Sequence, residues 1–195
     1  MDGRAHQTGS ATVLHFVRPV AHPPDRVWRR LVEPSALAEW LGPAVLEPVV
    51  GGRVALDLSE SGGGLIGGRV RRLRCGTLLE HSWGASCSDV AAGWIRWRLH
   101  PAGCGTRLSL SHCPSAAADP PFALACWHLR LDLLLASFEL GSTLWLPARL
   151  ERLRRHYAER IEKAIVTDCD PTTSSGPPLP GGRTAPTGSL QERVG

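Results

Sequence analysis

Apolar and polar side chains alternate strictly through two neighbouring stretches of the chain, residues 92–101 and 105–114. The side that carries the larger apolar groups comprises Ile95, Trp97, Leu99, Thr106, Leu108, Leu110 and His112. The positions between them hold mainly arginine and serine, which are usually solvated. Such alternation is typical of antiparallel strands with one covered and one wet face, so we predict a hairpin here.

Less extended alternating stretches predict the rest of a sheet. Further strands are expected at residues 12–20, within 45–58 (two strands), at 66–74 and at 77–84. In the stretch 77–84, Leu79, His81 and Trp83 fall on the inward side at a spacing of two. The chain therefore contains a strand meander that needs a covering layer on one face.

Two short helices are predicted between the first strand and the meander. Pro24 and Pro34 suit the first turn of a helix, where a missing N–H costs nothing. Apolar residues after Pro24 fall on one helical face, and Gly42 closes the second helix after Leu41. The order is thus strand, two short helices, then strands.

A long helix is predicted from Asp119, a capping residue followed by two prolines, to Gly141. It carries two apolar stripes. The first is Phe122, Leu124, Trp127, Leu131, Leu134, Leu135 and Phe138, and the second is Cys126, Leu129, Leu133, Ala136 and Leu140. A helix that is apolar on most sides is covered on more than one side. The sheet covers one stripe; the short helices, a last helix from Pro147 or another subunit covers the second.

Composition divides the chain into four segments. Residues 1–11 are polar and are expected to form a flexible tail, and residues 12–141 form the domain. Residues 142–166 add a C-terminal helix, and residues 167–195, rich in Pro, Gly, Ser and Thr, are expected to be disordered. The 43% of hydrophobic residues supports a packed core in the middle segment.

One short motif raises the question of nucleotide binding. Gly62, Gly64 and Gly67 have the spacing of a dinucleotide-binding loop. That motif requires a helix after the last glycine, whereas the following residues predict a turn and another strand. The only lysine, Lys163, is far from any phosphate-loop pattern. We therefore predict a glycine-rich turn and no nucleotide cofactor.

Charge and cysteine usage exclude further classes of protein. The net charge is +4, with arginines scattered along the chain, so no basic face for nucleic acid is indicated. The six cysteines show no zinc-ligand spacing, and we expect no metal. No signal peptide and no run of 18 apolar residues occurs, which predicts a cytoplasmic protein without membrane insertion.

Several stretches together resemble the SRPBCC superfamily (START-like, helix-grip fold), in particular bacterial relatives of the activator of heat-shock protein 90 ATPase. They are "HPPDRVWRRLVEPSALAEWLGP", "VVGGRVAL", "GGRVRRLRCGTLLEHSW", "CGTRLSLSH" and "ALACWHLRLDLLLASFELG". The resemblance implies an α+β fold in which a curved antiparallel sheet wraps around the long C-terminal helix.

The resemblance also implies a cavity between the sheet and the long helix. Its expected ligand-binding residues are Trp40, His81, Trp83, Trp97, Leu108, Leu110, His112, Trp127, Leu131 and Leu134. An apolar, aromatic lining with a few polar tips is the usual composition of a small-ligand site. Trp40, near a helix end, is expected at the mouth.

Three functions remain open. The chain binds a small hydrophobic molecule, or it is an enzyme such as a polyketide cyclase or dehydratase that uses a cavity histidine, or it is a protein-interaction module, such as a chaperone co-factor or a homodimer. His81 and His112, if they meet, suit a polar ligand group or acid–base work; the alternative is two hydrogen-bonded core histidines. No catalytic motif is present. We favour the binding function.

Overall fold

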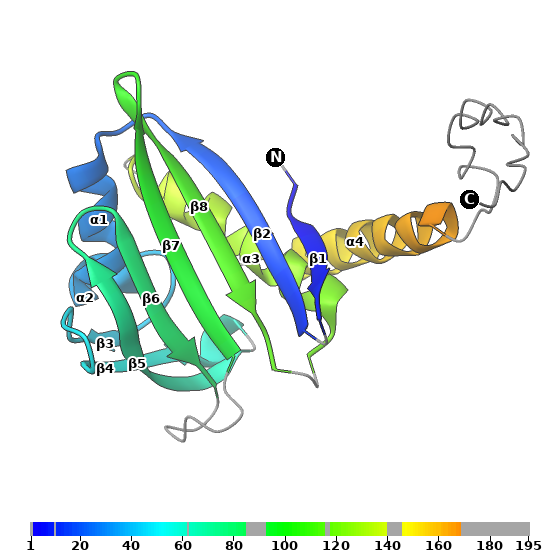
Figure 1. The fold of residues 1–195 in the computed structure, drawn as a ribbon, viewed down its shortest axis with the longest axis horizontal. Coiled ribbons are helices and arrows are strands. Elements are labelled where there is room, and N and C mark those ends of the chain that lie inside the picture. The colour runs from blue at the N-terminus through cyan, green and yellow to red at the C-terminus, as the bar shows by residue number, and fades with distance from the viewer. Residues whose placement is uncertain are drawn as a thin grey trace, which may run out of the picture.

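Residues 2–9, 11–61, 63–84, 93–115, 118–139 and 146–168 are described by a computed structural model, with side chains to Lys163. In this part of the chain, eight antiparallel strands form one curved sheet in the order β1-β2-β8-β7-β6-β5-β4-β3 (Figure 1). The strands are β1 (Arg4–Thr8), β2 (Ala11–Val20), β3 (Ala44–Leu46), β4 (Arg53–Leu58), β5 (Gly64–Arg74), β6 (Leu78–Trp83), β7 (Gly93–Ala102) and β8 (Gly105–Cys113).

Helices pack on the concave side and at one end of this sheet (Figure 1). They are α1 (Pro24–Val32), α2 (Pro34–Ala38), the single 3-10 turn η1 (Ser59–Ser61), α3 (Pro120–Ala136) and α4 (Pro147–Asp168). The α+β helix-grip fold expected from the sequence is confirmed. None of the described helices is long and apolar enough to cross a membrane.

Alternation fixes the register of the central strands. Ile95, Trp97 and Leu99 of β7 are buried, while the arginines between them lie on the outer face. Trp97 pairs with Leu79 of β6 on one side and Leu110 of β8 on the other. A shift by one residue would bury the arginines, so this register is strongly specified.

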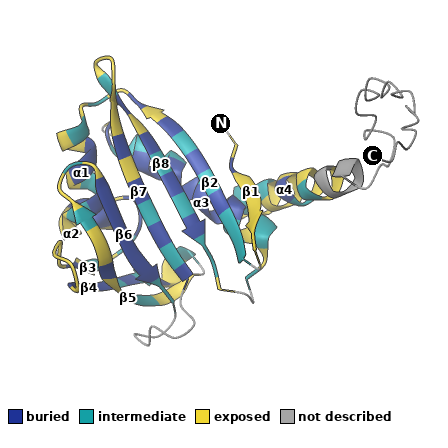
Figure 2. Cartoon of the chain, viewed as in Figure 1, coloured by how far each residue is buried: buried dark blue, intermediate teal, exposed yellow. Residues whose placement is uncertain are grey.

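The N-terminal residues differ from the flexible tail that the sequence predicted. β1 pairs with β2 along its length and forms an edge of the sheet, although all its side chains are exposed (Figure 2). The backbone N–H of Gly3 donates to Tyr157 Oη on α4 at 2.9 Å. The segment is held by backbone pairing and by this hydrogen bond rather than by burial of apolar side chains. Its low content of apolar residues therefore gave no indication that it is ordered.

One inward position on β2 was missed. The register that buries Leu14, Phe16 and Val20 also buries Arg18, whose guanidinium carbon lies 5.5 Å from the centre of the Phe16 ring. Nε and Nη2 of Arg18 have no hydrogen-bond partner among the described residues. Burial lowers the pKa of Arg18, opposed by the negative charge of Asp132.

Helix α3 begins at Pro120, as predicted, but without the expected cap. Asp119 makes no side-chain cap hydrogen bond, and its Oδ2 instead accepts from Arg154 Nε of α4 at 3.3 Å. The helix ends at Ala136, where Ser137 Oγ donates back to the carbonyl of Leu134 at 2.8 Å. The expected terminating glycine, residue 141, lies outside the described residues.

The second side of α3 is covered by α4, one of the three alternatives that the sequence left open. His128 of α3 and Tyr157 of α4 share a hydrogen bond of 2.8 Å between Nδ1 and Oη. Asp132 accepts a hydrogen bond from Arg149 of α4, and Tyr157 is buried. The first two residues of the predicted disordered segment, 167–195, are the last two of α4, and the rest of that segment lies outside the described residues.

Candidate functional site

The fold brings the predicted lining residues together between the sheet and α3. Trp83 is half-buried and the other nine are buried: Trp40, His81, Trp97, Leu108, Leu110, His112, Trp127, Leu131 and Leu134. Trp40 does not lie at a mouth, because its indole is enclosed and Nε1 donates to the carbonyl of Arg30 at 3.0 Å. Trp40 lies in the turn that follows α2.

Tryptophan side chains fill the middle of this space. Trp40 packs edge-on against Trp97, and Trp97 packs edge-on against Trp127, with ring centres 6.0 and 5.6 Å apart. The cavity left among them is about 10 Å³, roughly the room that one water requires. The centre of the expected cavity is therefore core, and no ligand of useful size fits there.

A larger hollow opens beside the N-terminal half of α3, and we call it the α3 pocket. Its volume is about 120 Å³, and it is lined by Leu58, Ser61, Gly63, Ile66, Trp83, His112, Phe122, Ala123, Cys126, Trp127 and Arg130. Three of the predicted residues, Trp83, His112 and Trp127, belong to this lining. Trp83 and Trp127 lie 5.4 Å apart between ring centres and form an aromatic wall.

His112 is the polar group on the sheet side of the α3 pocket. Trp127 Nε1 donates to His112 Nδ1 at 2.9 Å, and both side chains are buried. Burial lowers the pKa of His112 to about 3, and the positive charge of Arg130 adds to the effect. The imidazole is therefore neutral near pH 7, and its Nε2 has no hydrogen-bond partner in the described part of the chain.

Arg130 is a lining residue that sequence reasoning missed. Its side chain is only 5% exposed, Nη2 donates to Ser61 Oγ at 3.1 Å, and the guanidinium carbon lies 5.6 Å from the Trp127 ring centre. Burial lowers the pKa of Arg130, but an arginine stays charged near pH 7. Its position three residues after Trp127 on the helix was the available signal.

His81 does not meet His112, because β7 runs between their strands and Ile95 pairs with both. Its Nδ1 lies 2.9 Å from the carbonyl oxygen of Ser82, so Nδ1 carries the proton and donates. Burial lowers the pKa of His81 to about 4. His81 therefore matches the alternative of a hydrogen-bonded core histidine.

The glycine motif forms no phosphate loop. Gly64 begins β5 with φ +65°, and Gly67 lies within that strand, paired with Ala55 of β4. No helix follows the last glycine, since β5 leads to β6. Gly62 lies outside the described residues. The strand that was predicted after the motif is present, but the predicted glycine-rich turn does not include Gly64 and Gly67, which are residues of β5.

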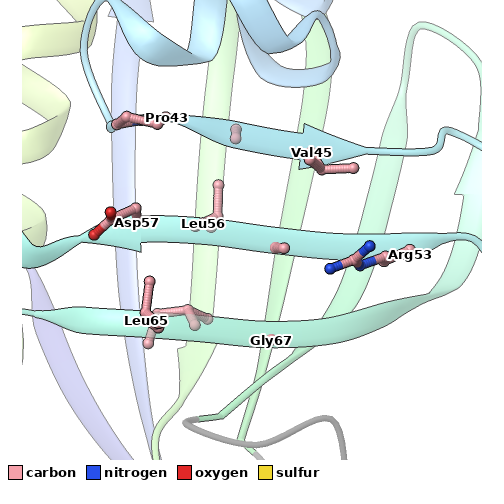
Figure 3. Close-up of a pocket in the computed structure, with 10 residues that line it drawn as sticks. Pro43, Val45, Arg53, Leu56, Asp57, Leu65 and Gly67 are labelled. Atoms are coloured by element: carbon pink, nitrogen blue, oxygen red, sulfur yellow. The ribbon is translucent and has the colours of Figure 1, made fainter.

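The opposite face of the sheet carries a hollow of larger volume, which we call the outer groove (Figure 3). It measures about 450 Å³ and is lined by Pro43, Ala44, Val45, Arg53, Ala55, Leu56, Asp57, Leu65, Ile66 and Gly67. Val45 and Leu65 are 46% and 68% exposed there. Figure 3 shows Arg53 and Asp57 toward the two ends of β4.

The family model described as "Activator of Hsp90 ATPase homolog 1-like protein" matches residues 21–138. No curated protein matches the chain. Among solved structures, a conserved protein of unknown function, EF2215 from Enterococcus faecalis, is 19% identical over 83% of this chain and 91% of its own, with a TM-score of 0.66. CalU16 from Micromonospora echinospora is 19% identical over 84% and 96%, with a TM-score of 0.63. These two likenesses show the fold alone.

Proposed function

Because the chain belongs to the family of activator of Hsp90 ATPase homolog 1-like proteins, within the SRPBCC superfamily, we propose that it binds a small, largely apolar molecule in the α3 pocket. The family supports a ligand-binding type of domain. The molecule would lie against Trp83 and Trp127, with one part near His112.

The observation that carries this proposal is the lining of the α3 pocket. Aromatic and aliphatic side chains, among them Phe122, Leu58 and Ile66, surround the polar groups of Ser61, His112 and Arg130. Small-ligand sites typically combine such walls with a few polar groups. The volume of about 120 Å³ approaches that of a cavity of about 150 Å³ that accepts benzene, so a single ring fits the interior.

The state of the two histidines favours binding over catalysis. A general base works best with a pKa near the working pH. Burial lowers the pKa of His112 to about 3 and that of His81 to about 4, so both are weak bases. In His112 the basic Nδ1 is also occupied by the Trp127 indole. This chemistry suits a fixed hydrogen-bond partner rather than a proton shuttle.

Toluene titration of the purified full chain tests the proposal. A ligand that binds only the folded state raises the unfolding temperature in a saturable way. Ala123→Phe fills the α3 pocket, and Ala148→Phe on the exposed surface of α4 is the matched control. We expect saturable stabilisation of the wild type and of Ala148→Phe, and none of Ala123→Phe. No saturable binding to the wild type, or equal binding to Ala123→Phe, would reject the site.

A further inference from the structure

We infer that the molecule in the α3 pocket carries a hydrogen-bond acceptor, a carboxylate or carbonyl oxygen, that binds His112 Nε2–H beside Arg130. This inference rests on the proposed function and names the chemical class of its ligand. It favours a small aromatic acid over a hydrocarbon or an amine.

The hydrogen bond from Trp127 fixes the tautomer of His112. An indole N–H only donates, so His112 Nδ1, which lies 2.9 Å from Trp127 Nε1, must accept. A neutral imidazole that accepts at Nδ1 carries its proton at Nε2. The remaining polar group of His112 is therefore the donor Nε2–H. This nitrogen is buried and has no hydrogen-bond partner among the described residues.

A buried donor without an acceptor is costly, and proteins rarely keep one. Ser61, the hydroxyl in the lining, does not supply the acceptor, because its Oγ is bonded to the carbonyl of Leu58 and to Arg130 and makes no hydrogen bond with His112 Nε2. His112 lines the α3 pocket, so an acceptor atom of a bound molecule can complete its hydrogen bonding.

Charge in the pocket favours an anionic acceptor. The described lining contains the cationic Arg130 and no acidic side chain. The field of Arg130 reaches His112, since it helps to lower the pKa of that imidazole. Hydrogen bonds to ionised groups are about twice as strong as neutral ones, so a carboxylate is favoured over a ketone of the same shape.

Three probes of similar shape test the ligand class: benzoate, toluene and benzylamine. With the wild type we expect benzoate to bind at least about tenfold tighter than toluene, and benzylamine to bind more weakly than toluene. Arg130→Met should abolish the preference for benzoate and keep toluene binding. Arg18→Met, which removes a buried arginine that does not line the pocket, should leave the preference intact.

The possible results separate the two proposals. Toluene binding as tightly as benzoate overturns the acceptor inference and leaves pocket binding standing. Failure of all three probes overturns both. Nitrogen-15 NMR of His112 is independent of any variant: a protonated Nε2 is expected in the free protein, and a protonated Nδ1 would overturn the inference.

The outer groove carries an independent inference. We propose that it packs against the same groove of a second copy of this chain. Val45 of β3 and Leu65 of β5 are exposed on either side of β4 (Figure 3). Val45 pairs with the small Ala55 of β4, which pairs in turn with Gly67 of β5. Exposed apolar surface of this kind often marks an interaction site.

Charge complementarity selects a second copy as the occupant. Arg53 and Asp57 lie two residues on either side of Ala55 and both line the groove. Neither side chain has an ion-pair partner within 4.0 Å among the described residues. Consider a two-fold axis that lies in the plane of the outer groove and crosses β4 at Ala55, at right angles to the strand. Rotation about this axis exchanges the two ends of β4. Each Arg53 then faces Asp57 of the other copy, twice by symmetry.

Charge reversal tests the paired grooves by sedimentation velocity on the full chain. The wild type should dimerise between micromolar and millimolar concentration. Arg53→Asp and Asp57→Arg should each weaken the dimer by about tenfold or more, and the double variant should restore it. Arg107→Asp, exposed on β8, is the control and should have no effect. A wild-type monomer throughout, single variants equal to the control, or no restoration would each overturn this inference.

Discussion

The indole N–H of Trp127 donates to Nδ1 of His112 across 2.9 Å, and this bond joins the long helix to the middle of the sheet. Both partners are buried, so water cannot replace either one. The bond fixes the rotation of α3 over β8 and also fixes the tautomer of the histidine. One contact therefore links the packing of the core to the chemistry of the α3 pocket.

Trp127→Phe should lower the free energy of unfolding by about 2–4 kcal/mol. It removes packed atoms from the core and leaves His112 Nδ1 without its donor. Urea unfolding measures the change. Trp94→Phe on the half-buried outer side of β7 is the matched control and should cost less. Equal losses for the two variants would show that the hydrogen bond contributes nothing beyond ring size.

Stability should fall as the pH falls below about 6.5, because of His81 and His112. Burial lowers the pKa of His81 to about 4 and that of His112 to about 3, from an ordinary value of 6.5. Below about pH 6.5 the unfolded chain therefore binds protons that the folded chain does not. The stabilisation that comes from keeping these histidines neutral is complete above that pH. Lowering the pH from about 7 to about 5 reduces the free energy of unfolding by about 2 kcal/mol for each histidine.

Urea unfolding at the two pH values measures this slope. His112→Gln should reduce the pH-dependent loss by about 2 kcal/mol relative to the wild type. His100→Gln, at an exposed position on β7, should leave the loss unchanged. A slope that is the same in wild type and His112→Gln would mean that His112 is not held neutral by burial.

Tyr157→Phe should free the N-terminal strand from α4. The phenolic oxygen accepts from the Gly3 N–H at 2.9 Å and lies 2.8 Å from His128 Nδ1. Loss of these bonds should cost about 1–2 kcal/mol and speed amide exchange in residues 3–8. Hydrogen-exchange mass spectrometry detects the change. Unchanged exchange there would show that the hydrogen bonds of Tyr157 do not hold β1.

Gly68→Ala should destabilise the sheet where β5 meets β6. A Cβ at residue 68 would lie 2.4 Å from the carbonyl oxygen of Ser82 and 2.7 Å from its Oγ. We expect a loss of about 1–3 kcal/mol by thermal unfolding. Because the nearest obstacle is backbone, Ser82→Ala added to Gly68→Ala should not rescue stability. Rescue would identify the hydroxyl as the obstacle instead.

Sequence periodicity predicted the central sheet and α3 because burial there depends on side-chain type. Only one register through β7 and β8 buries Trp97 and Leu110 and places Arg96 on the outer face, where it pairs with Glu80. β1 could not be predicted in this way, because its side chains are exposed and it is held by backbone pairing with β2 and by the hydrogen bond from Gly3 to Tyr157.

The candidate site was predictable only in part. The alternation of apolar and polar residues along the strand predicted that His112 points inward. The spacing of apolar residues along the helix predicted the same for Trp127. Whether large rings leave a space depends on how they tilt, and Trp40 and Trp97 close the centre in a way that no spacing reveals. Arg130 was missed because a charged residue within an apolar stripe is usually assigned to the surface.

The central claim, that a small apolar molecule occupies the α3 pocket, is tested most directly by the indole N–H signals in nitrogen-15 NMR during a toluene titration. We predict saturable shifts of the Trp83 and Trp127 signals, with little change at Trp94 on the outer face. Unchanged Trp83 and Trp127 signals at saturating toluene, or shifts confined to other tryptophans, would contradict the account.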